Sequence, residues 1–105
     1  MLHLTFRRVR PGQEAALRAW MAELGRRPYE VRATFRQAGV RHEQAFLLQT
    51  VDGLVLVYAH EVEDPAAAHA AYAASSLPLD AEHRARMAAV LDDVVEPELL
   101  YDVKL

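Results

Sequence analysis

The sequence predicts an α+β fold in which a four-stranded antiparallel sheet carries helices on one face. Two observations support this prediction. Apolar residues alternate with a period of two in residues 2–9 and on both sides of the Asp-Gly pair at 52–53, as in half-buried strands. They recur with helical spacing in residues 14–38 and 65–94, as in helices that bury one stripe. The expected order is strand, helical segment, strand, strand, helical segment, strand.

The first strand and the first helical segment are separated by the breaker sequence RPGQE. In residues 2–9, Leu2 and Leu4 face one side, and His3 and Thr5 face the other. The helical segment starts at Glu14 and is interrupted near Gly25 and Pro28, so two helical pieces are expected. The second piece ends at Gly39, a residue suited to the left-handed conformation that closes helices.

Residues 40–62 predict a hairpin, because Asp52-Gly53 suits a two-residue type I′ turn. With these two as turn residues, Val51 pairs with Leu54, and the register divides the side chains between two faces. The face expected beneath the helices holds Phe46, Leu48, Val55, Val57 and Ala59. The face expected to be free of helices holds Glu43, Ala45, Leu47, Gln49, Leu54, Leu56, Tyr58 and His60.

The second half of the chain predicts two helices and a last strand. Asp64 and Pro65 suit the N-cap and first position of one helix. The next helix is expected from about Ala81 to Val94 with Asp80 as its N-cap, and Pro97 then leads into a strand over residues 98–105. With right-handed crossovers this order is the ferredoxin-like β-α-β-β-α-β fold, formed by a single domain over residues 1–105.

Composition excludes several classes of function. The net charge is −3 and the basic residues are scattered, so no nucleic-acid partner is expected. The chain has no cysteine, which excludes disulfides and thiolate-held metals, and its histidines lack the spacing of a metal motif, so neither a metal nor an organic cofactor is expected. No apolar run is long enough to span a bilayer, and no signal segment is recognisable, so the expected location is cytoplasmic.

The face predicted to be free of helices mixes aliphatic side chains with ionisable ones, which indicates a covered pocket. His60 lies diagonally across from Glu43 in the expected register, so it is the candidate general acid or base, with Glu43 orienting it. Tyr58 is expected to reach the same pocket as a hydrogen-bond donor. We expect a second copy of the chain to cover this face as a homodimer, and the alternative is that Tyr58 and His60 are only rim residues of that interface.

Four further residues are candidates for the site. Arg7 on the first strand has a guanidinium suited to a ligand carboxylate or to an acidic group of a partner, and Trp20 lies in the core stripe of the first helix, where packing or ligand contact would explain it. Asp80 and His83 stand three residues apart at a helix start. The cap explains Asp80, whereas His83 lies one turn before Met87 in the buried stripe and must meet a partner inside.

The segments WMAEL, AGVRHEQAFL, DGLVLVYAHEVED and LDAEH give the chain its resemblance to a family of small uncharacterised bacterial proteins with a dimeric α+β barrel fold. The most specific part of this resemblance is a helix-start motif H-P-I-D-x-E-H, which stands here as residues 77–83 with Leu77 in place of the first histidine. The wider superfamily that the chain resembles includes cofactor-independent monooxygenases, haem-degrading enzymes, lactone isomerases and sugar mutarotases, with the L-rhamnose mutarotases similar in length.

These observations lead to two main hypotheses about function. The first is a cofactor-independent enzyme, of isomerase, mutarotase or monooxygenase type, that transfers a proton on a small molecule in the pocket. The alternative is a non-catalytic module that binds a small molecule or a partner in the same place. A third, haem-related hypothesis requires an axial ligand, for which His69 or His83 would serve.

Overall fold

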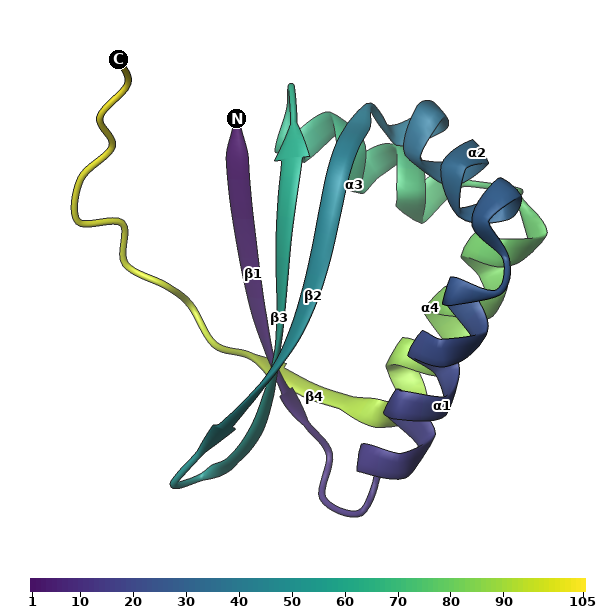
Figure 1. The fold of residues 1–105 in the computed structure, drawn as a ribbon, viewed down its shortest axis with the longest axis vertical. Coiled ribbons are helices and arrows are strands. Elements are labelled where there is room, and N and C mark those ends of the chain that lie inside the picture. The colour runs from purple at the N-terminus through teal and green to yellow at the C-terminus, as the bar shows by residue number, and fades with distance from the viewer.

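The computed structural model describes all residues from Met1 to Leu105 and has two layers, a sheet and a set of helices (Figure 1). The strands are β1 (Leu2–Val9), β2 (Val40–Thr50), β3 (Gly53–Val62) and β4 (Leu91–Val94). The helices are α1 (Glu14–Gly25), α2 (Pro28–Ala38), α3 (Pro65–Ala74) and α4 (Pro78–Val90). The sheet has four strands in the order β2-β3-β1-β4 with antiparallel neighbours, as the ferredoxin-like prediction requires.

Local sequence signals explain most of the element boundaries. The Asp64 carboxylate accepts a hydrogen bond from the backbone N–H of Ala67, and Pro65 follows it as the first residue of α3. Gly39 closes α2 in the left-handed conformation, with φ 75°. No helix is long and apolar enough to span a bilayer.

The hairpin turn differs by one residue from the prediction. Thr50 pairs with Gly53, so Val51 and Asp52 form the turn instead of Asp52 and Gly53. The Thr50 hydroxyl donates to the Gly53 carbonyl and accepts from the backbone N–H of Asp52, which stabilises the turn at this position. The shift leaves the same residues together on each face but places Glu43 directly opposite His60.

The prediction of which face lies beneath the helices was wrong. The core joins Leu56 of β3 to Leu17 of α1 and to Val90 and Leu91, so the helices cover the face that also carries Glu43, Tyr58 and His60. On this face Leu56 belongs to the core, and Leu47 and Leu54 pack against it. The side chains on the other face therefore include half-exposed Phe46 and Leu48.

The last strand was also placed wrongly. Helix α4 ends at Val90, four residues before the predicted end at Val94, and β4 follows at once. Pairing with β1 ends where the Val95 N–H donates to the Phe6 carbonyl, two residues before Pro97, which has no N–H to continue the ladder. Residues 98–105 form no strand, and the tail extends away from the helices beyond the sheet (Figure 1).

We propose that the homodimer expected from the sequence forms through the sheet face opposite the helices, instead of the face that carries Glu43, Tyr58 and His60. Leu4, Phe46 and Leu48 share this face and are 44%, 51% and 50% exposed, which is unusual for large apolar side chains grouped on one sheet. Two copies that pack this face against each other would bury it symmetrically.

Changing both Phe46 and Leu48 to glutamate should therefore convert a dimer into a monomer of 11.8 kDa in sedimentation experiments, because two buried carboxylates per face would remain unpaired. The control is Val51→Glu, which introduces one glutamate at a turn residue with a fully exposed side chain and should leave the dimer intact. A wild-type protein that sediments as a monomer would exclude this interface.

Candidate functional site

A cavity of about 430 Å³ lies between the helix-covered face of the sheet and the helices. Its volume is in the range of small-molecule sites, about 300–1,000 Å³, and most of its wall is apolar. The polar side chains in the wall come from both layers. They include Glu43, Tyr58, His60, Tyr72, Asp80 and His83.

The cavity forms where the helix layer packs loosely on the sheet. The buried core cluster uses residues from α1, α4, β1, β3 and β4, whereas α2 and α3 contain no buried residue. Helix α3 is mostly alanine, in the sequence PAAAHAAYAA, and these short side chains cannot reach the sheet. The pocket predicted between two copies of the chain thus lies within one copy, beneath its own helices.

His60 and Glu43 form a close pair on neighbouring strands at one end of the cavity. His60 Nε2 lies 3.0 Å from Glu43 Oε2, and the two side chains are 20% and 26% exposed. If Nε2 donates to the carboxylate, Nδ1 of the neutral ring is left with the lone pair that can accept a proton. The ring of His3, which faces His60 from β1, stacks at 6.4 Å.

Tyr58 lies beside this pair and faces the helices. Its ring stacks on His60 at 5.5 Å and meets His83 edge-on at 6.5 Å, so it lies between the two imidazoles. Burial raises the pKa of Tyr58 well above its usual range, and the nearby Glu43 carboxylate raises it further. The phenol therefore stays protonated, and its closest polar neighbour is the Met21 sulfur at 4.0 Å.

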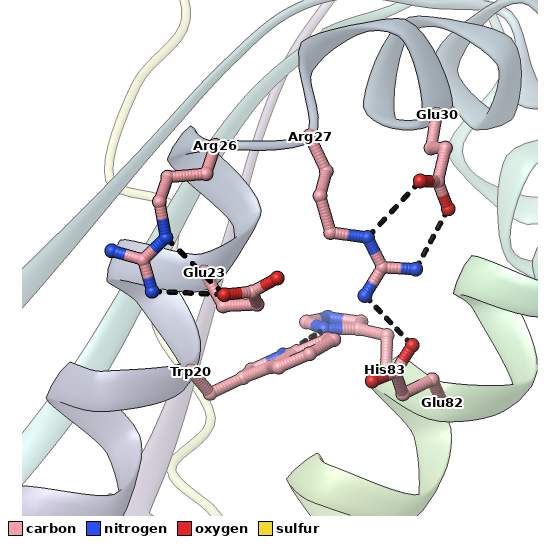
Figure 2. Close-up of polar contacts among 7 residues, drawn as sticks. All are labelled: Trp20, Glu23, Arg26, Arg27, Glu30, Glu82 and His83. Atoms are coloured by element: carbon pink, nitrogen blue, oxygen red, sulfur yellow. Dashed lines mark hydrogen bonds and ion pairs between the residues drawn. The ribbon is translucent and has the colours of Figure 1, made fainter.

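His83 and Trp20 are joined by a hydrogen bond between α4 and α1 (Figure 2). The indole Nε1–H of Trp20 donates to His83 Nδ1 at 2.8 Å. An indole is a donor only, so the neutral His83 ring carries its proton on Nε2. Burial lowers the pKa of His83 below its ordinary value of 6.5, and the charges of Glu43 and Asp80 only partly oppose this. His83 is thus held as a neutral imidazole with Nε2–H as its donor.

The burial of His83 predicts that the folded chain loses stability in mild acid. The unfolded chain protonates His83 near pH 6.5, whereas the folded chain resists protonation until a lower pH, so the unfolded state binds more protons in between. The contribution of His83 is complete above about pH 6.5 and is lost as the pH falls through that window, with a slope of at most about 1.4 kcal/mol per pH unit.

Urea denaturation between pH 7.5 and 5 should therefore show a smaller loss of stability in His83→Gln than in the wild type. The control is His42→Gln, which changes an exposed imidazole on the other face and should leave the wild-type slope unchanged. A wild-type slope in His83→Gln would show that His83 protonates equally in both states.

Asp80 does not act as the helix cap that the sequence predicted. Helix α4 starts at Pro78 with Leu77 as its N-cap, and the Asp80 N–H donates to the Leu77 carbonyl. Asp80 is therefore the third residue of the helix, where it is only 2% exposed. Its carboxylate lines the cavity and makes no hydrogen bond or ion pair within the chain.

Arg7 lies in the cavity wall but is engaged by the chain itself. Its Nε and Nη2 atoms donate to the Asp92 carbonyl at 2.8 and 2.6 Å. Along β1 it pairs with Leu56, four residues from His3, which pairs with His60. Arg7 therefore holds β4 against β1, and it does not reach the Glu43–His60 end.

Two contributors were missed in the sequence. Tyr72 is not among the site residues expected from the sequence, but it lines the cavity with its ring edge-on to His83 at 5.9 Å, and burial raises its pKa to about 12. Arg27 is likewise not among the expected site residues, but it forms ion pairs with Glu30 and Glu82 at 2.7 and 2.8 Å (Figure 2). The Tyr72 spacing from His69 was a usable signal, whereas nothing in the sequence connects Arg27 with Glu82.

Arg27 also fixes the position of the Trp20–His83 pair. Its guanidinium lies 6.0 Å from the centre of the Trp20 ring, and Arg86 lies 5.3 Å from the same ring. Because Glu82 precedes His83 in α4, the Arg27–Glu82 ion pair holds that turn of α4 against the start of α2 (Figure 2). This ion pair thereby holds the Nε2–H donor of His83 in position.

Comparison with known proteins identifies the family of this chain. No group of three or more histidine, cysteine, aspartate or glutamate side chains is arranged to hold a metal ion. No curated protein and no solved structure matches the chain. A family model described as a family of unknown function, DUF6176, matches residues 2–105. Since this match covers nearly the whole chain, the protein belongs to the DUF6176 family of unknown function.

Proposed function

We propose that this protein is an enzyme that transfers a proton on a small molecule held in the cavity, without an organic cofactor. The observation that carries the proposal is that the His60–Glu43 pair and the tautomer-fixed His83 line one cavity of about 430 Å³. One imidazole has a carboxylate partner, and the other is kept neutral. Acid–base sites typically contain two ionisable groups whose different surroundings suit one to accept a proton and the other to donate a hydrogen bond.

His60 is the proposed base. Its Nδ1 lone pair would take a proton from the carbon next to a substrate carbonyl, and the electron pair would move onto the carbonyl oxygen. The imidazolium so formed is stabilised by Glu43 Oε2, 3.0 Å from Nε2. In a hydroxyketone, the hydroxyl proton then passes to the former carbonyl oxygen, and the imidazolium returns a proton to the former carbonyl carbon, which completes an isomerisation and restores His60. The imidazolium proton exchanges with solvent before it is returned, so deuterium enters the carbon position in D₂O.

His83 and the two tyrosines are the proposed donors to the oxygen that becomes negative. The Nε2–H of His83 and the protonated Tyr72 hydroxyl lie on α4 and α3, across the cavity from the sheet. The raised pKa of Tyr72 keeps its hydroxyl protonated, and the lowered pKa of His83 keeps its ring neutral. Both groups therefore stabilise the negative oxygen by hydrogen bonds and keep their own protons.

The experiment that tests this function is isotope exchange in D₂O followed by proton NMR. The panel contains hydroxyketones, reducing sugars and lactones, each with and without an amino group. The expected result is faster loss of a carbon-bound proton signal with the wild-type protein than without it, because His60 removes that proton. If panel members raise the thermal midpoint of unfolding but none exchanges, the cavity is a binding site and the catalytic proposal fails.

A further inference from the structure

The buried carboxylate of Asp80 lacks a partner inside the chain. It is 2% exposed and lines the cavity, and no hydrogen bond or ion pair of the chain includes its side chain. Because no fully buried side-chain oxygen of the chain lacks a partner, the carboxylate oxygens of Asp80 are reached from the cavity. An uncompensated buried charge is costly, so buried carboxylates are normally paired with a donor or a cation. The missing partner must therefore come from the solvent or from a ligand in the cavity.

The surroundings of Asp80 favour a positive charge. Tyr72 and His83 place aromatic rings beside it, and Tyr58 adds a third ring across the cavity. The faces of such rings attract cations. The second carboxylate of the cavity, Glu43, lines the same cavity as Asp80, so two negative groups border one space.

The two arginines nearest this space are engaged elsewhere and do not pair with Asp80, although the Arg84 guanidinium lies 5.5 Å from the centre of the Tyr72 ring. Arg7 is bound to the Asp92 carbonyl near the β4 end of the cavity. Arg84 donates to the backbone carbonyls of Tyr72 and Ser75 at the end of α3. Neither guanidinium forms an ion pair with Asp80.

We infer that the cavity takes a ligand with a protonated amine, whose N–H groups pair with the Asp80 carboxylate against the rings of Tyr72 and Tyr58. The rest of the ligand would lie along the apolar wall formed by residues such as Phe35, Leu79 and Met87. The inference rests on the proposed function only in placing the substrate in this cavity, and it names the class of substrate as a small amine.

Calorimetric titration with three probes of one shape tests the inference. Benzylamine is a cation at neutral pH, benzyl alcohol is a neutral donor and benzoate is an anion. We expect benzylamine to bind the wild type at least about tenfold more tightly than benzyl alcohol, as for a hydrogen bond to a charged group. Benzoate should not bind, and Asp80→Asn should abolish the preference for the amine.

The matched control is Asp93→Asn, which removes an exposed carboxylate and should keep the preference. As a measurement without a variant, the carboxyl ¹³C resonance of Asp80 in the wild type should shift when benzylamine is added. Equal affinity for benzyl alcohol, tighter binding of benzoate, an unmoved Asp80 resonance or no saturation by benzylamine up to about 10 mM would each overturn the inference.

These titrations involve no turnover, so their outcome is separate from that of the proposed function. If His60→Gln keeps the amine preference and no compound exchanges with the wild type, the catalytic proposal fails and the amine site stands. If isotope exchange occurs without a preference for amines, the proposed function stands and this inference fails.

Discussion

Replacing His60 with glutamine is expected to lower the rate of isotope exchange by at least about 100-fold, the usual contribution of a general base. Glutamine can still donate to Glu43 but cannot accept a proton at neutral pH. The free energy of unfolding should change by less than about 1 kcal/mol, because glutamine keeps a donor to Glu43 and the two side chains are only partly buried. Proton NMR in D₂O measures the rate, and urea denaturation measures the stability.

The control for this variant is His42→Gln. It removes an exposed imidazole from the sheet face opposite the cavity. It should exchange protons at the wild-type rate. Glu43→Gln should lower the rate less than His60→Gln, since it weakens the orientation of the base and keeps the base itself. A His60→Gln variant that retains wild-type exchange, or that unfolds at much lower urea, would make His60 a structural residue.

Replacing Leu17 with alanine is expected to lower the free energy of unfolding by about 3 kcal/mol, as for other fully buried leucines. Leu17 is 2% exposed and joins α1 to Leu56 of β3, the strand that carries Tyr58 and His60. The variant should therefore unfold at a clearly lower urea concentration. Because most folded domains are stable by only about 5–15 kcal/mol, this loss is a large share of the total.

The control for Leu17 is Leu2→Ala, which shortens a leucine that is 74% exposed in the isolated chain. Its loss in the monomer should stay below about 1 kcal/mol. A loss below this value in Leu17→Ala would contradict the packing of α1 on the sheet. A loss in Leu2→Ala that appears only at high protein concentration would instead support the dimer expected on that face.

The fold was predictable because its signals are local. Period-two alternation defined β1, and the turn residues defined the hairpin to within one residue. The choice between the two sheet faces was not local, since it depends on which side chains meet Leu17 and Val90 from helices far along the chain. The end of β4 likewise depends on pairing with Phe6 at Val95, which no signal near residue 95 reveals.

The candidate site was predictable in part for the same reason. The register of a hairpin decides which residues face each other. Glu43 and His60 are neighbours on one face in both the predicted and the observed register, so their nearness was predictable although the turn was one residue off. The hydrogen bond from Trp20 to His83 joins residues 63 positions apart, so only the packing of α1 on α4 brings them together. Asp80 was assigned to a cap because aspartate favours caps, but the helix starts at Pro78 and turns this carboxylate inward.

The central claim is that the catalytic candidates share an open cavity beneath the helices of one copy of the chain. A crystal structure of the protein soaked with benzylamine tests it most directly. The expected result is electron density between Asp80 and Tyr72, with His60, Glu43 and His83 facing the same space. A cavity closed by its own side chains, or filled by side chains of a second copy, would contradict the account.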